Sequence, residues 1–534
     1  MVRRATARGN QRTDLEITPA FGEALRLMDT TSQNLFITGK AGTGKSTLLA
    51  HFRATTRKSV VVLAPTGVAA LNVRGQTVHS FFHFPLDVTP DKIARRLIKP
   101  RDKALYKKIT TIIVDEVSML RADILDSIAT FLSLYGPRSG TPFGGVQMVF
   151  IGDLYQLPPV VPSAEREIFQ THYTTPYFFS AHAFTSLPLT LLELEKIYRQ
   201  KDADFIDLLN RVRNNTATPA DLTILNARVG LQTPTSSDPS AEGLRITLTA
   251  TNRGADAINT ERLALLKGRV HTSGAIIKGQ VGKDSYPTAT ELTFKVGAQI
   301  MLLNNDSHRR WVNGSLGVVK GVGEDDEGEP FVRIRLAGDD EDVEVYPFTW
   351  EIVRFGLEAQ TIVAEPVGTF TQYPFRLAWA VTIHKSQGQT FDHVALDVER
   401  GAFAPGQTYV ALSRCTSFEG LSLLRPLRTS DIRTDFNVRK FLANWRWSLS
   451  AEALPTDDKV RLLETAIREG TALAITYLKP DDTRSERTIR PLSVGNMEYK
   501  GKTYLGLRAF CLMRHEERTF RVDRILSLAT ATGT

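Results

Sequence analysis

The sequence predicts an α/β fold built on parallel β-sheets, and three observations support this class. Residues 34–38 form an apolar run that leads into a glycine-rich loop and then into a helical run at residues 47–50. Residues 111–114 form a β-branched run that ends in two adjacent acids, and residues 146–151 form an apolar run that ends in Gly-Asp. Strands that are apolar on both faces are typical of parallel sheets covered by helices. In such sheets the chemistry lies beyond the carboxyl ends of the strands.

Size and composition place the chain among globular proteins of several domains. Its 534 residues correspond to about three to five domains of ordinary size. A hydrophobic content of 42% and a charged content of 23% are ordinary, and a net charge of +8 suits a polyanionic partner without establishing one.

Targeting signals and cysteine usage favour a cytoplasmic protein. The two cysteines, Cys415 and Cys511, are too few for a disulfide framework or a zinc site, which favours a reducing compartment. The basic segment 1–16 has no apolar core of the kind that a secretory signal needs, and we expect a flexible tail there. Residues 168–192 lack acidic, Lys and Arg residues but contain two prolines and many polar residues, so no membrane span is expected.

Residues 39–46, GKAGTGKS, match the pattern GxxxxGK[ST] in the strand–loop–helix setting that this pattern requires. The glycines let backbone N–H groups curl around phosphate oxygens, and the helix N-terminus adds its positive dipole end. Lys45 is expected to reach the β- and γ-phosphates of a nucleotide, and Ser46 to bind Mg²⁺. The predicted nucleotide-binding residues of this loop are Gly39, Ala41, Gly42, Thr43, Gly44, Lys45, Ser46 and Thr47.

Two further loops are expected to complete a site for ATP hydrolysis. Asp115 is predicted to hold hydrated Mg²⁺, and Glu116 to polarise the attacking water. Gln156 lies in the loop 152–159, where two prolines stiffen the backbone, and its carboxamide is predicted to sense a γ-phosphate. The alternative for Gln156 is an ordinary proline-rich loop exit. ATP and Mg²⁺ are therefore the predicted cofactors.

Seven motifs occur in the order in which one protein family carries them. They are GKAGTGKST, LAPTGVAALNVRGQTVHSF, IIVDEVSML, FIGDLYQLPPV, YRQ, YPFRLAWAVTIHKSQGQTF and YVALSRCTS. With these motifs, roughly residues 20–445 resemble a bacterial member of the petite-integration-frequency (PIF) helicase family, in the 5′→3′, RecD-like branch of superfamily one.

The resemblance implies two RecA-like lobes that enclose the ATP site. Residues 92–108 carry eight Lys and Arg residues against Asp102, which suits a wedge beside a duplex junction or, alternatively, a solvated helix. The implied boundaries are 17–195 for the first lobe with a wedge insertion at 82–108, 196–295 and 373–450 for the second lobe, and 296–372 for a small β-barrel inserted in the second lobe.

Two arginines beyond the first lobe are candidates for contacting the nucleotide. By the resemblance Arg199 and Arg414 are arginine fingers that reach across the cleft, whereas a lone arginine more often forms a surface salt bridge. One departure concerns the base, because family members often carry an adenine-reading Gln well before the phosphate loop. Residues 17–23 contain no Gln, and Gln33 is no obvious substitute, so selectivity for adenine is not predicted.

The resemblance also implies which residues grip single-stranded DNA. Phe81 is expected to stack on a base, the alternative being that Phe81 or its neighbour Phe82 belongs to the core. The implied DNA-contacting residues are Thr66, Gly67, His79, Ser80, Phe81, Thr249, Thr251, Asn252, His384, Lys385 and Ser386.

The polar loop 382–391, TIHKSQGQTF, is expected to touch both DNA and nucleotide. By the resemblance its first half, with His384 and Lys385, faces the DNA, while Gly388 and Gln389 face the ATP phosphates. Which side Ser386 and Gln387 serve is left open.

The C-terminal part predicts a separate small module. Residues 459–469 have helical spacing and are followed by several short strand-like runs. Residues 455–534 resemble a WYL domain, a small Sm-like β-barrel. A basic pocket of this domain would bind single-stranded nucleic acid or a nucleotide ligand, although a structural cap or a docking module is the alternative. The implied pocket residues are Tyr477, Arg490, Arg518 and Arg521.

Taken together, the residues and the resemblance predict an ATP-dependent 5′→3′ DNA helicase. It would move on single-stranded DNA, unwind tailed duplexes or G-quadruplexes, and serve repair, replication or a role akin to telomere maintenance. Alternatives are a translocase that does not unwind, or a ligand-gated ATPase regulated by the WYL domain. We expect a monomer in solution, associated with the nucleoid, with no membrane partner.

Overall fold

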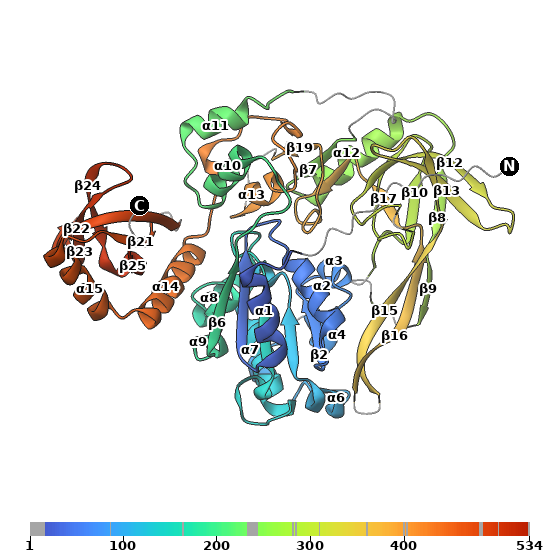
Figure 1. The fold of residues 1–534 in the computed structure, drawn as a ribbon. Coiled ribbons are helices and arrows are strands. Elements are labelled where there is room, and N and C mark those ends of the chain that lie inside the picture. Colours follow the sequence, from blue (N-terminus) through green and yellow to red (C-terminus); the bar gives the residue numbers. More distant parts are fainter. Residues whose placement is uncertain are drawn as a thin grey trace, which may run out of the picture.

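The computed structural model divides the chain into four connected parts (Figure 1). Two parallel sheets form two lobes, antiparallel strands are inserted in the second lobe, and another antiparallel sheet follows a long helix. No helix in the described part is long and apolar enough to cross a bilayer. The predicted tail 1–16 lies outside the described residues except for Glu16. The structure describes residues 16–85, 87–162, 165–231, 244–279, 282, 286–308, 310–358, 361–398, 401, 404–479, 484–499 and 501–531.

The first lobe is a six-stranded parallel sheet in the order β3-β2-β4-β5-β1-β6. The strands predicted at 34–38, 111–114 and 146–151 are present as β1, β4 and β5. Because the strands are parallel, the loops after them meet at one edge of the sheet, where the predicted site residues lie. The strands are β1 (Asn34–Gly39), β2 (Val60–Ala64), β3 (Gln76–Thr77), β4 (Thr111–Val114), β5 (Gln147–Ile151) and β6 (Leu189–Leu194).

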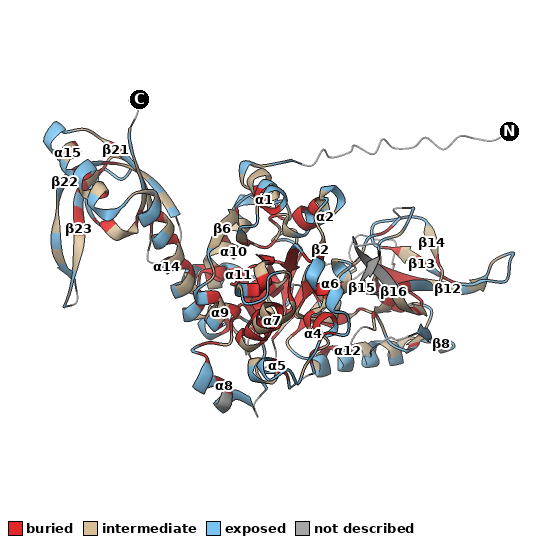
Figure 2. Cartoon of the chain, turned by 90° about the horizontal axis from the view of Figure 1, so that it is seen from below, coloured by how far each residue is buried: buried red, intermediate tan, exposed pale blue. Residues whose placement is uncertain are grey.

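Helices cover both faces of this sheet, as its apolar strands require. One buried cluster joins Phe52 of α2 to Val62 and Ile113, and a second cluster on the opposite face includes Phe131 of α7. Figure 2 shows the buried residues concentrated along the strands of this lobe. The helices are α1 (Pro19–Thr30), α2 (Lys45–Thr55), α3 (Gly67–Asn72), α4 (Val78–Phe82), α5 (Pro90–Ala94), α6 (Lys103–Lys108), α7 (Ala122–Tyr135), α8 (Arg166–His172) and α9 (His182–Thr185).

The second lobe is a four-stranded parallel sheet in the order β18-β7-β19-β20. One cluster of buried side chains runs from Phe36 in the first lobe to Leu248 in the second, so the two lobes share a continuous core. The elements are α10 (Ala203–Arg213), α11 (Pro219–Asn226), β7 (Ile246–Thr249), α12 (Asn252–Leu265), β18 (Ala380–Thr382), β19 (Val394–Asp397), α13 (Gln407–Leu412) and β20 (Leu421–Leu423).

The inserted strands begin earlier than the predicted residue 296. β8 (His271–Gly274) pairs with β10 (Glu291–Phe294), and β9 (Ile276–Gly279) pairs with β16, so these strands belong to the insertion. The remaining pairs run β14-β13-β12-β11-β17 and β15-β16-β9. Neither order closes on itself among the described residues, so the predicted barrel is not confirmed.

The long ribbon of β15 and β16 reaches from the insertion to α6 of the first lobe (Figure 1). Through this ribbon the insertion contacts the segment 82–108 predicted to be a wedge. The strands of the insertion not yet given are β11 (Gln299–Leu302), β12 (Leu316–Glu324), β13 (Pro330–Leu336), β14 (Asp342–Val345), β15 (Phe348–Glu358), β16 (Thr361–Gln372) and β17 (Phe375–Leu377).

Helix α14 (Phe436–Ala453) follows the second lobe in sequence but packs on the first. The ring of Phe441 stacks on Phe179 with centroids 4.2 Å apart, and Trp445 lies 6.2 Å from Phe36. The predicted second-lobe range 373–450 thus includes the start of a helix that packs on the first lobe. The aromatic side chains of α14 contact aromatic rings of the first lobe, which places the helix there.

The C-terminal module is an antiparallel sheet in the order β24-β23-β22-β21-β25 with one packed helix. β24 and β25 are its edges, so the predicted Sm-like barrel is not closed among the described residues. The helix predicted at 459–469 is present as α15, and Gly470 caps its end with a φ of +65°. The elements are α15 (Thr456–Glu469), β21 (Leu473–Leu478), β22 (Arg484–Tyr499), β23 (Lys502–Cys511), β24 (Glu516–Arg521) and β25 (Ile525–Thr530).

The structure corrects the prediction that Phe81 stacks on a base. Phe81 and Phe82 are 2% and 0% exposed, and their rings lie 4.8 Å apart. Both rings pack on Tyr106 of α6, whose hydroxyl donates to the carbonyl oxygen of Phe81 at 2.7 Å. Since the short helix α4 turns both rings toward α6 and α7, both residues belong to the core.

We predict that Phe82→Ala lowers the free energy of unfolding by about 3–5 kcal/mol, because it leaves a cavity among packed rings. The matched control is Phe436→Ala on α14, since Phe436 is 71% exposed. That variant should change the free energy by less than about 0.5 kcal/mol. Chemical denaturation measures both, and equal losses would contradict the prediction.

Candidate functional site

The glycine-rich loop after β1 has the geometry of an anion cradle. Gly42 and Gly44 have φ values of +80° and +85°, which glycine adopts without strain. Helix α2 begins at Lys45 without a side-chain cap, so its first backbone N–H groups are not used by a capping residue. The Lys45 Nζ donates to the carbonyl oxygens of Gly39 at 2.7 Å and Lys40 at 2.8 Å. The loop therefore holds the Lys45 amine between two of its own carbonyls.

Two carboxyl groups lie at the same edge of the sheet. Asp115 and Glu116 follow β4, with Asp115 buried and Glu116 half-buried. Burial raises the pKa of both, and the charge of Glu116 helps to raise the pKa of Asp115 to about 7. The positive charges of Lys45, Arg414 and Arg199 oppose this rise at Glu116. Predicted catalytic groups of both lobes therefore lie within electrostatic range of one another.

The oxygen atoms at this edge fit a magnesium ion. Ser46 supplies a hydroxyl from the first turn of α2, and Asp115 supplies a carboxylate, both of which are hard ligands of the kind that Mg²⁺ prefers. The charge of Lys45 only partly offsets the burial of this carboxylate, and a divalent cation would supply further positive charge.

A buried ion pair joins the loop after β5 to the last turn of α10. Asp153 and Arg213 lie 3.0 Å apart, with side chains 0% and 5% exposed. Burial alone would raise the pKa of Asp153, but the charges of Arg213 and Lys45 hold it below its usual value. The guanidinium of Arg213 also lies 3.9 Å from the ring centroid of Tyr155. The pair therefore fixes the first lobe to the helix that opens the second.

Tyr409 of α13 connects this ion pair to the phosphate loop. Its hydroxyl accepts the backbone N–H of Ala41 at 2.9 Å and donates to Asp153 at 3.3 Å. Asp153, Arg213 and Tyr409 were not among the predicted site residues. Asp153 and Tyr409 lie inside two of the seven motifs, so the motifs could have pointed to them as site residues. Arg213 lies outside all seven motifs, and the sequence offered no such indication.

The two predicted arginine fingers lie at the cleft, Arg414 buried and Arg199 half-buried. Arg414 is 1% exposed and donates to the carbonyl oxygen of Gln389 at 3.3 Å. Burial and the charge of Arg199 lower the pKa of Arg414 to about 9. Arg199 donates to the carbonyl oxygen of Ser413 at 3.2 Å. Among the described residues neither arginine forms the exposed salt bridge that is the usual alternative, and both influence Glu116.

The lobes approach each other closely around Gln156. A Cβ atom on Gly406 would lie 2.4 Å from the carbonyl oxygens of Tyr155 and Gln156, so only glycine permits this contact. The carboxamide of Gln156 accepts from the side chain of Gln387 at 3.4 Å. A space of about 10 Å³ remains between the phosphate loop, α10 and Tyr409, which is room for about one water.

The polar loop 382–391 supplies this contact through a residue whose role the sequence left open. Gln387 reaches Gln156, whereas Gly388 lies beside Asn72 of α3. The Gln389 side chain lies against Gly314 of the insertion. The backbone carbonyl oxygen of Gln389 accepts a hydrogen bond from Arg414. Gln387 is thus the residue of this loop that reaches Gln156, while the nucleotide contacts of Gly388 and Gln389 stay predictions.

Two predicted DNA contacts are internal to the fold. Ser386 is 0% exposed, and its hydroxyl donates to the carbonyl oxygen of Ile383 at 2.8 Å. Thr249 is 3% exposed and donates to the carbonyl oxygen of Thr251 at 2.9 Å. Both hydroxyls hold turns at the ends of strands, so neither side chain is available to DNA.

The other predicted DNA contacts gather at turns of both lobes. Thr66 and Thr251 cap α3 and α12 by accepting from the backbone of Ala69 and Gly254. Lys385 is exposed at the turn after β18, and partial burial lowers the pKa of its neighbour His384. Of the other predicted DNA contacts, Gly67 and Asn252 begin α3 and α12, while His79 and Ser80 lie within α4.

The four residues predicted for the C-terminal pocket do not converge. Arg490 pairs in register with Phe510, and Arg518 pairs with Ala509, so these arginines lie on opposite faces of the sheet. The Tyr477 hydroxyl accepts the backbone N–H of Arg521 at 3.3 Å. Of the four, only Tyr477 and Arg521 are neighbours. Arg490 and Arg518 are separated because successive side chains along a strand point to opposite faces of the sheet.

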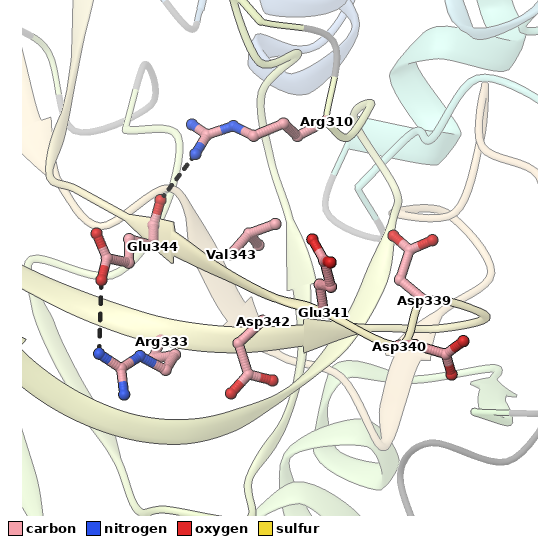
Figure 3. Close-up of a pocket in the computed structure, with 8 residues that line it drawn as sticks. All are labelled: Arg310, Arg333, Asp339, Asp340, Glu341, Asp342, Val343 and Glu344. Carbon is pink, nitrogen blue, oxygen red and sulfur yellow. Dashed lines mark hydrogen bonds and ion pairs between the residues drawn. The ribbon is translucent and has the colours of Figure 1, made fainter. Parts of the chain in front are cut away.

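A hollow of about 630 Å³ lies on the insertion rather than at this site (Figure 3). Four consecutive acids, residues 339–342, line it together with Val343 and Glu344. The arginines Arg310 and Arg333 both bond to Glu344, at 3.4 and 3.5 Å. Because negative charge prevails, this hollow is unsuited to nucleotide or DNA phosphates.

We predict that Asp115 makes the stability of the nucleotide-free protein depend on pH. Its pKa rises from 3.8 to about 7 in the fold. The stabilising contribution of the protonated form is therefore complete below about pH 4 and is lost as the pH rises through about 7. Asp115→Asn should flatten the fall in melting temperature between pH 5.5 and 8. An unchanged slope in metal-free buffer would contradict this.

We predict that Tyr409→Phe lowers kcat for ATP hydrolysis by about tenfold, the effect of losing about one hydrogen bond that positions α13 and Arg414. Tyr198→Phe is the control, since Tyr198 is 45% exposed and lies beside Gly44. Steady-state hydrolysis measures both variants, and equal kcat values would show that the Tyr409 hydroxyl is dispensable.

Comparison with known proteins gives consistent matches. Residues 20–221 match the PIF1-like helicase family and residues 458–530 match the WYL domain. The chain is 32% identical over 425 residues to ATP-dependent DNA helicase Pif1 of Bdellovibrio bacteriovorus, covering 77% of this chain and 88% of that protein. It is 34% identical over 437 residues to human ATP-dependent DNA helicase PIF1, covering 80% of this chain but 64% of that protein.

Solved structures agree with this grouping. Bacteroides Pif1 in complex with ADP-AlF4 is 34% identical with a TM-score of 0.71, covering 81% of this chain and 98% of that one. Bacteroides Pif1 in complex with ADP-AlF3 and single-stranded DNA has a TM-score of 0.59 at 34% identity, with the same coverage. With this identity, this coverage and the site described above, the chain belongs to the PIF1-like helicase family.

Proposed function

We propose that this chain is an ATP-dependent DNA helicase that moves 5′→3′ along single-stranded DNA. The observation that carries the proposal is the convergence of Arg199, Arg414 and Gln387 from beyond the first lobe on the acids and the sensor Gln156 of the first lobe. A site divided in this way ties the separation of the lobes to the state of the nucleotide.

Each group at the site has a role suited to ATP hydrolysis. Lys45 and the uncapped start of α2 bind phosphates, and Ser46 and Asp115 hold Mg²⁺, which neutralises charge on the phosphates. Glu116 orients the attacking water and accepts its proton. Arg199 and Arg414 stabilise charge on the transferring phosphoryl group, because a guanidinium stays charged even when buried.

DNA as the partner is supported by the turns of both lobes and by the relatives. The Bacteroides protein was solved with single-stranded DNA, and the turns predicted here to contact DNA carry Thr66, Thr251 and exposed Lys385. Loop 382–391 places Lys385 two residues from Gln387, so a contact at DNA and a contact at the nucleotide cleft share one short turn. We extend the proposed substrates to tailed duplexes and G-quadruplexes.

We predict ATP-dependent unwinding of a duplex with a 5′ single-stranded tail and none of a duplex with a 3′ tail. Lys45→Ala removes the phosphate-binding amine and should abolish unwinding while leaving DNA affinity within about threefold. A strand-displacement assay with both substrates measures the polarity. Equal unwinding of both tails would refute the direction, and DNA-stimulated hydrolysis without unwinding would leave only translocation.

A further inference from the structure

The C-terminal module contacts the motor through two glutamates at the end of β6. Arg484, at the start of β22, lies 3.0 Å from Glu195 and 3.2 Å from Glu193. Arg446, on α14, lies 3.1 Å from Glu193, and these two side chains are 7% and 14% exposed. Glu193 therefore receives one buried arginine from α14 and one partly exposed arginine from the module.

The strand that carries Glu193 is pressed against the phosphate loop. β6 pairs with β1 in a register that places Glu193 opposite Thr38 and Leu194 opposite Gly39. A Cβ atom on Gly39 would lie 2.6 Å from the carbonyl oxygen of Leu194, so the two backbones are in close contact. A shift of β6 would therefore be transmitted directly to the first residue of the loop.

The chain contacts the loop a second time after β6. The backbone N–H of Tyr198 donates to the carbonyl oxygen of Gly42 at 2.8 Å. The side chain of Arg199 lies so close to Gly42 that a Cβ atom there would approach it to 2.6 Å. The segment that starts at Glu193 thus holds both the beginning and the middle of the loop.

Charge provides a second link between the module and the loop. Burial lowers the pKa of Lys40 in the loop, Arg213 lowers it further, and both Glu193 and Glu195 raise it. Burial would raise the pKa of Glu193, but Arg446 and Arg484 keep it below its usual value. The positive charge of Arg484 is therefore part of the electrostatic environment of the phosphate loop.

We propose that Arg484 and Glu193 are positioning residues through which the C-terminal module sets the affinity of the motor for nucleotide. This inference rests on the proposed ATPase function, because it concerns the same loop. The module holds β6 in place through Arg484, and β6 holds the loop. Neither residue touches the reacting atoms, so the effect should fall on nucleotide binding more than on the chemical step.

The test is charge reversal at Arg484 in the full-length chain. We expect Arg484→Glu to raise the Kd for a fluorescent ADP analogue and the KM for ATP about fivefold, the upper range for one partly exposed ion pair. The kcat should change less than about twofold, since the arginine fingers remain in place. The double variant Arg484→Glu with Glu195→Arg restores the opposite-charge pair at residue 195 but not at Glu193, so it should recover only part of the lost affinity.

Arg508→Glu is the matched control, because Arg508 pairs at 2.9 Å with Glu517 inside the module and makes the same charge change away from the motor. Nucleotide affinity should stay at the wild-type value in this control. If Arg484→Glu binds ADP like the wild type or like Arg508→Glu, the inference is wrong while the ATPase proposal stands. If the wild-type chain neither binds ADP nor hydrolyses ATP, the proposed function itself fails.

Discussion

The ion pair between Asp153 and Arg213 is the interaction on which the arrangement of the two lobes depends. Removing both charges from water is costly, and the attraction between them offsets this only when further hydrogen bonds satisfy the carboxylate. Those bonds come from the backbone N–H of Tyr155 and the hydroxyl of Tyr409. The first lobe, α10 and α13 must therefore all be in place for Asp153 to keep this full set of partners.

The same network explains how the second lobe faces the loop. Tyr409 occupies the backbone N–H of Ala41, and five residues further along the chain Arg414 is held by carbonyls of the loop 382–391. Gly406 allows the close approach that brings α13 to Gln156. These contacts lie between the lobes, so a change in the separation of the lobes would break several hydrogen bonds together. Such a contact set suits a device with two discrete arrangements.

The attachment of the C-terminal module follows from a similar principle. Helix α14 returns from the second lobe to the first because its aromatic side chains pack on Phe179 and Phe36. It carries the module to the side of β6, where Arg446 and Arg484 meet Glu193. Sequence order alone would place the module beside the second lobe, so its contact with the phosphate-loop sheet is a result of packing.

The sequence by itself determined the groups whose geometry is local. The loop 39–47, the acids after β4 and the strands that lead to them follow from glycine conformations and from residues adjacent in the chain, and the structure places all of them at one edge of the sheet. Tertiary structure decided burial and pairing between distant residues, which no local pattern encodes. It turned Phe81, Thr249 and Ser386 inward, separated Arg490 from Arg518, and brought Arg213 to Asp153. These outcomes depend on which surfaces meet when helices and sheets pack, and that is a property of the whole chain.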